Sequence, residues 1–353
     1  MFQRRQRISL RRSALLLAFA LLLALGSAAC RTADSPGAAP VLVKRAQMHM
    51  GTLVTISGVA ATEDIAQRAV DAGFKEVHRL EELLSTWIPT SELSQVNSAA
   101  GVRPVPVSRD TFEILKRSLA VAEFTGGGFN IAIGPAVQLW SVTEQTRVPE
   151  ASDMLGVRPL VDLSNLTLDE ANRSVYLHKA GMRLDVGGIG KGFAASRAAT
   201  VMRATGALAG VVALSGDITT FGRMPEGKKF VFGIQHPRRE DRVLGRIELE
   251  DEAISTAGDY ERYFERDGVR YHHILDPRTL QPAGGCQSVT IIARDGTLAD
   301  GLDTGIFVLG PERGMALIEQ LPGVEGVIVD AEGKVHVSSG LKSRFRLERV
   351  PGQ

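Results

Sequence analysis

Apolar residues recur at helical spacing in two long stretches of the chain, residues 63–84 and 108–124. Positions three or four residues apart lie on one face of a helix, so both stretches are predicted to be amphipathic helices. The apolar positions are Val70, Phe74, Val77, Leu80 and Leu84 in the first stretch and Phe112, Leu115, Leu119 and Ala122 in the second. Further helices are expected over 193–204, from about Thr297, and after Pro311, because proline is tolerated in the first turn of a helix.

Short apolar runs between turn residues predict the strands. They cover residues 53–56, 182–186, 211–214, 230–234, 246–249, 288–293 and 326–329, and an aromatic strand is expected within 260–271. Strands and helices follow one another without a regular strand–helix–strand alternation. The pattern therefore favours an α+β fold, with mixed or antiparallel sheets and packed helices, over a doubly wound parallel sheet.

The first thirty residues have the pattern of an export signal. Arginines between Arg4 and Arg12 precede the apolar residues 14–25, a run too short for an ordinary transmembrane span. Small residues then lead to Cys30, which resembles a bacterial lipoprotein signal in which this cysteine becomes the lipidated first residue. A plain secretory signal cleaved near Ala29 is the alternative, and the arginine pair at 11–12 also permits a twin-arginine signal.

The expected domain organisation follows from this signal. Residues 1–29 are assigned to the signal peptide, residues 30–45 to a flexible tether, and residues 46–347 to one folded domain. The tether is rich in Ala, Ser, Gly and Pro, as flexible linkers are. The chain is therefore expected at the periplasmic face of the inner membrane, held by a lipid on Cys30. A soluble periplasmic protein is the alternative.

Composition narrows the classes of partner and chemistry. The chain has 353 residues, of which 44% are hydrophobic and 23% are charged, and its net charge is +1. These values are ordinary for a globular protein. Because the chain has no basic tract outside its N-terminus, nucleic acid is not an expected partner. Two cysteines, Cys30 and Cys286, are too few for a metal–thiolate cluster or a disulfide framework.

Residues 184–193, LDVGGIGKGF, form the sharpest local feature of the sequence. Closely spaced glycines let a backbone approach a phosphate, and the helix that follows offers free N–H groups at its N-terminus. Lys191 adds a positive charge. The spacing matches neither the Walker A loop nor the dinucleotide fingerprint, so a glycine-rich turn that packs helix on strand is the alternative. A second glycine-rich segment with aromatic residues, 126–140, suits a flat aromatic cofactor or a structural turn.

His272 and His273 offer a general base, because a histidine titrates near neutral pH. A lone histidine is more often structural. Since neighbouring residues of a strand point to opposite faces, at most one of the two enters a given site. We take His273 as the candidate and expect His272 to tolerate substitution.

Two interpretations of the segment from Thr297 to Thr304 are open. In the first, Thr297 is the N-cap of a helix and Asp300 completes a capping box. In the second, Asp300 and Thr304 lie on one helical face, four residues apart, and their oxygens suit a hard cation such as Mg²⁺. Asp303 is rotated about 100° around the helix and is expected to matter less.

Taken in order, these segments resemble the FAD:protein FMN transferase family, the ApbE-type flavin transferases. The resemblance runs from about residue 48 to 329. It rests on the motifs MGT (50–52), STW (85–87), SELS (91–94), GFN (128–130), GP (134–135), DVGGIGKG (185–192), SGD (215–217), STAGDY (255–260), HILDP (273–277) and ADGLDT (299–304). Three positions depart from the commonest pattern: Asn130 replaces aspartate, Ser215 replaces glycine and Ala257 replaces serine.

The resemblance implies an α+β fold related to tandem T-fold units, with FAD bound in a cleft as the substrate. By motif, the residues that touch FAD would be Met50, Trp87, Gly128, Phe129, Asn130, Lys191, Ala194 and Ile274. The metal Mg²⁺ would be held by the Gly190 carbonyl, Asp300 and Thr304, and His273 would be the base.

The implied reaction is Mg²⁺-dependent transfer of FMN from FAD to a threonine hydroxyl of an exported or membrane redox protein, with release of AMP. In the family the acceptor carries the motif Asp-x-x-Ser/Thr-Gly/Ser-Ala-Thr, whose last threonine is modified. This chain lacks the motif, so automodification is not expected. The alternatives are an FAD pyrophosphatase that uses water as nucleophile, a flavin-binding lipoprotein without turnover, and a structural envelope lipoprotein that binds no flavin.

Overall fold

The computed structural model describes residues 39–348. The expected signal peptide 1–29, Cys30 and most of the expected tether lie outside the described residues. Within residues 39–348, no helix is both long and apolar enough to cross a bilayer. The first strand begins at Val41, inside the range 30–45 that the sequence assigns to the tether.

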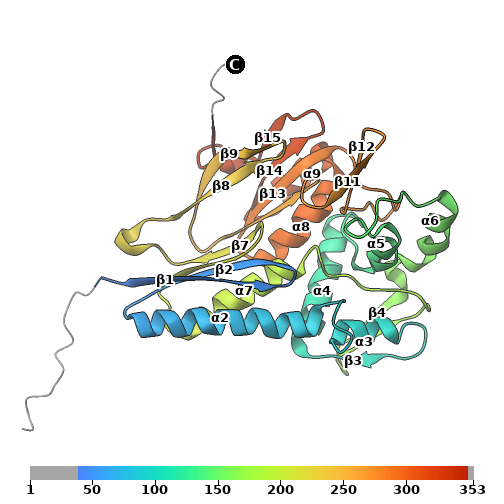
Figure 1. Ribbon diagram of the computed structural model, residues 1–353, viewed down its shortest axis with the longest axis horizontal. Coiled ribbons are helices and arrows are strands. Elements are labelled where there is room, and N and C mark those ends of the chain that lie inside the picture. The colour runs from blue at the N-terminus through green and yellow to red at the C-terminus, as the bar shows by residue number, and fades with distance from the viewer. Residues whose placement is uncertain (1–38, 349–353) are drawn as a thin grey trace, which may run out of the picture. The chain divides into compact units, whose positions relative to one another are not determined.

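An antiparallel sheet of eight strands is the main sheet of the described part (Figure 1). Its strand order is β1-β2-β6-β7-β10-β13-β14-β15, and neighbouring strands in it are antiparallel. The strands are β1 Val41–His49, β2 Thr52–Ala60, β6 Ala209–Leu214, β7 Asp217–Phe221, β10 Ala253–Gly258, β13 Cys286–Ala293, β14 Val324–Asp330 and β15 Val335–Val337. This order brings β7 next to β10, so segments that are distant in the chain meet in the middle of the sheet.

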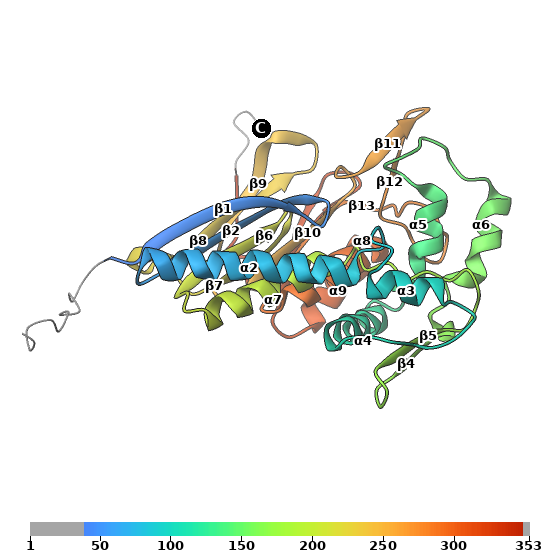
Figure 2. The ribbon, with the colours of Figure 1, turned by 60° about the horizontal axis from the view of Figure 1, so that its bottom comes forward.

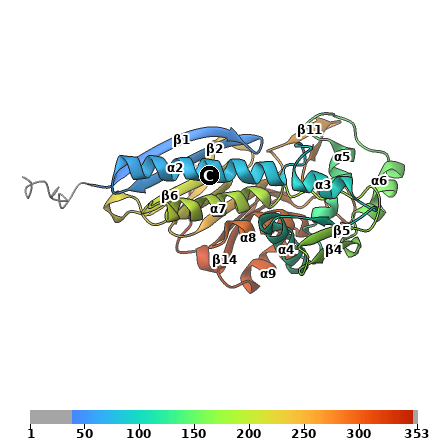
Figure 3. The same ribbon diagram turned by 90° about the horizontal axis from the view of Figure 1, so that it is seen from below.

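Four helices lie side by side against one face of this sheet (Figure 3). They are α2 Glu63–Leu84, α7 Gly190–Ala204, α8 Gly296–Leu309 and α9 Pro311–Gln320. Large apolar side chains are fully buried between helices and sheet, among them Ile56, Leu80, Phe193, Ile291 and Phe307. The contact between α7 and α8 joins two helices that are far apart in sequence.

A smaller sheet covers part of the opposite face. It consists of β8 Phe230–His236, β9 Arg239–Leu249 and β16 Arg346–Leu347 in the order β16-β9-β8. Ile292 packs against this smaller sheet, whereas its neighbour Ile291 packs against the helices. Neighbouring strand residues point to opposite faces, so the main sheet is a middle layer, and this explains why all of β13 is buried.

The remaining elements lie at one end of the main sheet. They are α3 Glu92–Ser98, α4 Arg109–Phe124, α5 Gly134–Trp140, α6 Ala151–Val157, a sheet of β3 Val105–Pro106, β5 Ser174–Leu177 and β4 Leu166–Asp169, and the hairpin of β11 Tyr263–Arg266 and β12 Val269–His272. Short 3₁₀ turns are formed by Ile131–Ile133, Arg158–Leu160, Leu163–Asn165, Pro225–Gly227 and Ser339–Leu341. The hairpin lies beside α5 (Figure 2), because the rings of Trp140 and Tyr271 stack at 5.7 Å.

The α+β class and the long helices predicted from sequence are confirmed. The predicted helix 63–84 has the same bounds in the structure. Helix α4 begins one residue after Ser108, since the Ser108 hydroxyl caps it by accepting a hydrogen bond from Thr111 N–H.

One predicted strand, 182–186, is wrong. Within the described residues 39–348, its backbone pairs with no strand. The N–H of Leu184 instead donates to Asn97 Oδ1 at 2.7 Å, and the Leu184 carbonyl accepts from Asn97 Nδ2 at 3.0 Å. An asparagine side chain therefore satisfies the groups that a strand partner would satisfy, and the segment is held extended outside a sheet.

Candidate active site

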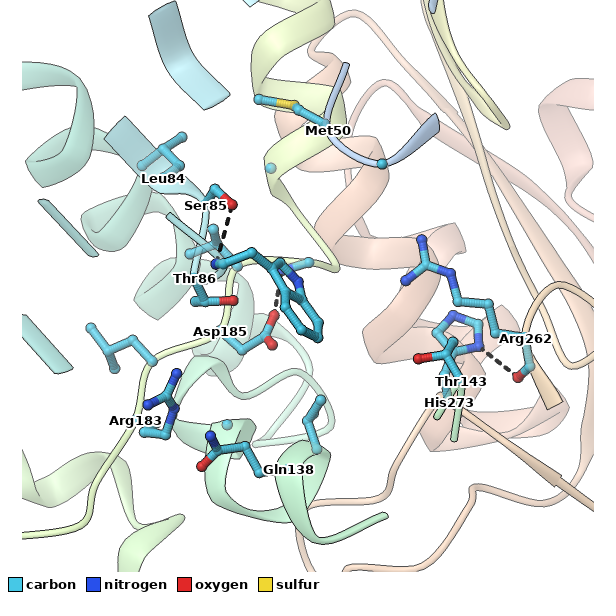
Figure 4. A pocket seen from close by; sticks show the side chains of 18 of the residues that line it. Met50, Leu84, Ser85, Thr86, Gln138, Thr143, Arg183, Asp185, Arg262 and His273 are labelled. Carbon is cyan, nitrogen blue, oxygen red and sulfur yellow. Dashed lines mark hydrogen bonds between the residues drawn. The ribbon is translucent and has the colours of Figure 1, made fainter. Parts of the chain in front are cut away.

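A cavity of about 830 Å³ lies between the end of α2, α5 and the β11–β12 hairpin. Its volume falls within the range of about 300–1,000 Å³ that is typical of small-molecule sites. The residues that line it include Met50, Gly51, Glu81, Ser85, Thr86, Trp87, Gln138, Thr143, Arg183, Asp185, Gly187, Gly190, Lys191, Arg262 and His273. Figure 4 shows His273, Arg262 and Thr143 grouped on one side of it, across from Asp185 and Gln138.

The glycine-rich segment before α7 has two roles. Gly187 and Gly190 line the cavity. A Cβ on Gly188 would lie 2.9 Å from Thr304 Oγ1, and a Cβ on Gly192 would lie 2.2 Å from the Gly296 carbonyl. Gly188 and Gly192 therefore allow α7 and α8 to pack closely. Gly187 leaves its backbone exposed to whatever occupies the cavity, whereas Gly190 is buried and borders the cavity.

Three buried carboxylates, Asp217, Asp300 and Asp303, form an acidic cluster behind this segment. One oxygen of each lies within 4.8 Å of the others. Asp217 opens β7, and Asp300 and Asp303 belong to α8. The Lys191 ammonium forms an ion pair with Asp217, and the Ser255 hydroxyl donates to Asp303 Oδ2 at 2.6 Å.

The acidic cluster is short of positive charge. Burial and then repulsion from Asp217 raise the pKa of Asp300 to about 7, although the charge of Lys191 lowers it. Burial, then Asp300 and Asp217, raise the pKa of Asp303 well above its ordinary value. Burial lowers the pKa of Lys191, but the carboxylates outweigh it and the net shift is upward. One ammonium faces three carboxylates, and such an all-oxygen, electron-rich set fits a hard divalent cation such as Mg²⁺.

Asp300 does not cap its own helix. The N-cap of α8 is Asp295, whose carboxylate accepts from Thr297 N–H and Leu298 N–H, so the predicted Thr297–Asp300 capping box is wrong. Oδ2 of Asp300 instead accepts a 2.7 Å hydrogen bond from Gly192 N–H in the first turn of α7.

Thr304 lies beside the acidic cluster, as expected, and its hydroxyl donates to Asp303 Oδ1 at 3.1 Å. Asp303, which the sequence ranks below Asp300 and Thr304, is buried and belongs to the cluster, so its position gives no reason to rank it below Asp300. Gly190, the third expected metal ligand, is the buried first residue of α7 and borders the cavity.

His273 follows β12 and faces the cavity. Its Nδ1 lies 3.3 Å from the Arg262 carbonyl, and when Nδ1–H donates to this carbonyl, Nε2 keeps a free lone pair. Burial lowers the pKa of His273, and the charge of Arg262 lowers it further. The ring is therefore neutral at neutral pH, which is the form that a general base requires.

His272 points the other way, as the strand alternation predicts. It is buried, its Nε2 lies 2.9 Å from the Ala283 carbonyl, and its Nδ1 lies 3.3 Å from Ile274 N. The edge of the ring meets Phe307. Both ring nitrogens are occupied by backbone groups, so His272 is a structural residue.

The residues expected to touch FAD fall into two groups. Met50, Trp87 and Lys191 line the cavity, and Trp87 is 79% exposed, so its indole ring is available for stacking. The structure does not bring the other five to the cavity. These are Gly128, Phe129, Asn130, Ala194 and Ile274.

The contacts of these five residues explain why they do not line the cavity. Phe129, Ala194 and Ile274 are buried in the core, and a Cβ on Gly128 would meet the Gly305 carbonyl at 2.8 Å. Asn130 Oδ1 accepts from Ala132 N–H and its Nδ2 donates to the Val161 carbonyl, both at 2.8 Å. The asparagine side chain therefore holds the start of the 3₁₀ turn at 131–133.

Several site residues received no role from the sequence. Asp217 and Ser255 lie in the SGD and STAGDY motifs, so the motifs themselves were a usable signal for them. Arg262 had no such signal, because it precedes an aromatic hairpin whose packing against α5 is visible only in three dimensions. No ion pair of Arg262 with a carboxylate occurs within residues 39–348.

The sequence and the fold match those of known proteins. Residues 50–328 match the ApbE family. A protein of Treponema pallidum named FAD:protein FMN transferase is 35% identical over 323 residues, which cover 86% of this chain and 88% of the relative. One of Klebsiella pneumoniae with the same name is 33% identical over 299 residues, covering 84% and 92%. The crystal structure of the ApbE protein of Thermotoga maritima superimposes with a TM-score of 0.80 at 32% identity, over 87% of this chain and 100% of that one.

Fold and relatives define an enzyme of the transferase class. The chain belongs to the ApbE family. The resemblance found in the sequence motifs is thereby confirmed.

Proposed function

We propose that the enzyme transfers FMN from FAD to a threonine hydroxyl of an acceptor protein and releases AMP, in a reaction that depends on Mg²⁺. The observation that carries this proposal is the position of Lys191. It lines the cavity and pairs with Asp217, so the acidic cluster and the cavity that holds His273 are parts of one site. The names of the relatives supply the flavin chemistry.

The residues that would hold Mg²⁺ are Asp217, Asp300 and Asp303, together with the Thr304 hydroxyl and the Gly190 carbonyl. An ion held there would supply positive charge to offset the negative charge that develops during phosphoryl transfer. The three buried carboxylates are the physical support for this assignment, because a single lysine does not balance them.

The chain's own groups would carry the remaining steps. The threonine oxygen attacks the FMN-side phosphorus, the bond from that phosphorus to the bridging oxygen breaks, and AMP leaves with this oxygen. His273 Nε2 takes the threonine proton, which contributes a factor of about 10²–10⁴ in rate for a well-placed base. Arg262, beside His273, points a guanidinium without a carboxylate partner among the described residues into the cavity, where it can bind a phosphate.

The exposed indole of Trp87 favours a pose in which the isoalloxazine stacks at the α2 end of the cavity. The pyrophosphate would then lie against the backbone of Gly187 and Gly190, close to Lys191. This pose puts the FMN-side phosphate between the acidic cluster and His273.

The test is incubation of the mature protein with FAD, Mg²⁺ and a peptide that carries the acceptor motif, read by mass spectrometry. We expect the peptide to gain one FMN and free AMP to appear. A peptide whose last threonine is alanine is the matched control and should stay unmodified. FMN and AMP without modified peptide would instead identify an FAD pyrophosphatase, and intact FAD would refute both activities.

We also propose that the enzyme is exported and held at the periplasmic face of the inner membrane by a lipid on Cys30, where it meets an acceptor redox protein. The support is the sequence of the first thirty residues. Each acyl CH₂ buried in a membrane contributes about 0.8 kcal/mol. Cys30→Ser should release an active enzyme from the membrane fraction, and a wild-type enzyme already found in the soluble fraction would contradict the anchor.

A further inference from the structure

A second group of side chains that could bind a metal lies at the edge of the cavity, and one of them, Glu81, also lines it. His49, at the end of β1, meets His78 and Glu81 of α2, and one ligand atom of each lies within 4.8 Å of the others. His78 and Glu81 are three residues apart and share one face of the helix. β1 runs alongside α2 (Figure 2), so the two elements supply the three side chains from adjacent positions.

The distance between Nδ1 of His49 and Oε2 of Glu81 matches the distance expected between two ligand atoms of one metal ion. His49 Nδ1 lies 3.3 Å from Glu81 Oε2. Two ligands of a tetrahedral ion with bonds of about 2.0–2.1 Å are separated by about 3.3 Å. Both side chains are largely enclosed by protein, at 14% and 23% exposure, whereas His78 is exposed and can rotate toward the other two.

The second nitrogen of His49 has the partner that a metal ligand needs. Nε2 lies 3.0 Å from Gln47 Oε1. When Nε2–H donates to this oxygen, the lone pair of Nδ1 faces Glu81. A metal-binding histidine usually donates its other N–H to an oxygen in this way, which fixes the ring and its tautomer.

We propose that His49, His78 and Glu81 bind a late first-row transition-metal ion, Zn²⁺ being the best match, with water as the fourth ligand. Two imidazoles and one carboxylate suit Zn²⁺, whereas the all-oxygen acidic cluster suits Mg²⁺. The enzyme therefore has two metal sites of different chemistry. The competing account is an ion pair between protonated His49 and Glu81, which would need no metal.

Glu81 connects this site with the cavity. Its Oε1 accepts a 2.6 Å hydrogen bond from Met50 N–H while Oε2 faces His49. Met50 and Gly51 line the cavity and have positive φ angles of 51° and 68°. One carboxylate thus holds both the proposed ion and the tight turn between β1 and β2 that forms part of the cavity wall.

The test is calorimetric titration of Zn²⁺ into the full mature chain without a histidine tag, in saturating Mg²⁺ so that the acidic cluster is occupied. We expect one tight Zn²⁺ site. Because changes to outer-shell partners alone weaken metal binding by about 10–100-fold, His78→Gln, which removes a direct ligand, should weaken it by more than about tenfold.

Two matched variants separate this site from other sources of Zn²⁺ binding. His178→Gln removes a different exposed histidine, one that contacts Thr167, and should keep wild-type affinity. Asp300→Asn, in the acidic cluster, should also keep the site. Unchanged Zn²⁺ affinity in His78→Gln, or no Zn²⁺ binding by the wild type under these conditions, would overturn the proposal and leave the ion pair of His49 with Glu81.

Discussion

The backbone N–H of Gly192 in α7 donates a 2.7 Å hydrogen bond to Oδ2 of Asp300 in α8. No side chain of its own N-cap residue caps α7, so a carboxylate from the neighbouring helix satisfies its first turn and lies at the positive end of its dipole. The same carboxylate belongs to the acidic cluster. Packing of the two helices and assembly of the proposed metal site therefore share one contact.

The first prediction concerns Gly192→Ala. The new Cβ would lie 2.2 Å from the Gly296 carbonyl and 2.6 Å from Asp300 Cβ, so the two helices must separate. We expect the free energy of unfolding to fall by about 2 kcal/mol or more and Mg²⁺ affinity to fall with it. Urea unfolding and Mg²⁺ titration measure the two effects.

Gly156→Ala in α6 is the control for that change, because nothing lies within 4 Å of its Cβ position. There, alanine should be neutral or stabilise the protein by up to about 1 kcal/mol. Equal stability of the two variants would show that α7 and α8 are not tightly packed at Gly192.

Asp303→Asn is predicted to be as damaging as Asp300→Asn. Both keep the side-chain shape and remove one negative charge from the acidic cluster. Turnover at ordinary Mg²⁺ should fall by more than about 100-fold, since changes outside the direct ligands alone cost about 10–100-fold in metal sites. Assays over a range of Mg²⁺ concentrations check this, and an Asp303→Asn enzyme with wild-type Mg²⁺ dependence would remove Asp303 from the site.

Thr304→Val should have a milder effect of the same kind. It replaces a hydroxyl that lies 3.1 Å from Asp303 Oδ1 with a methyl group of similar size, while all three carboxylates remain. We expect weaker Mg²⁺ binding and activity that returns in part at high Mg²⁺ or with Mn²⁺. If raising the metal concentration restores nothing, Thr304 does not contribute to metal binding.

The pKa of His273 sets the acidic limit of the reaction. Burial lowers this pKa below the ordinary value of about 6.5, so the neutral form persists as the pH falls through that value. At saturating Mg²⁺, which keeps Asp300 ionised, kcat should show no decline near pH 6.5. An acid limb centred at or above that pH would contradict the environment described for His273, and His273→Ala should bind FAD yet lose most transfer.

His272 is predicted to matter for stability, although substitution there is expected to leave catalysis unchanged. Burial lowers its pKa, so the unfolded chain binds a proton that the folded chain excludes. Its contribution is thus complete above about pH 6.5 and is lost as the pH falls below it. His272→Gln should cost about 1–3 kcal/mol at pH 7.5 and less at pH 5.5.

Urea unfolding of both proteins at the two pH values tests this, because groups common to both cancel in the difference. A difference that stays constant with pH would mean that His272 is not kept neutral. Activity per folded molecule should be unchanged, since the ring faces away from the cavity.

Local patterns predicted those elements whose stability is local. Helix α2 has an apolar face and a threonine cap, so its bounds followed from sequence. Strand β1 was not predicted from the sequence, because it pairs with β2 alone in the main sheet and more than half of its residues are exposed. Residues 182–186 are predicted to be a strand because no sequence pattern indicates that the Asn97 side chain hydrogen-bonds to their backbone in place of a neighbouring strand.

The site residues likewise divide into those found from local sequence motifs and those whose position depends on tertiary packing. His273 and Asp300 were found because short motifs contain them, whereas Asp303 was dismissed on an argument about helical faces. That argument assumes that one face of the helix meets solvent. In α8 both Asp300 and Asp303 are buried, so a rotation of about 100° moves a side chain from one packed surface to another and excludes nothing.

The position of α8 late in the sequence has a consequence for incomplete chains. Domains fold as units during and after synthesis, from the N-terminus onward. A chain that stops short of residue 296 already has Lys191 and Asp217 but neither Asp300 nor Asp303. It can form the Lys191–Asp217 ion pair but lacks the two further carboxylates that would bind a cation. Catalytic competence should therefore require nearly the whole polypeptide, and fragments that end before α8 should be unable to consume FAD.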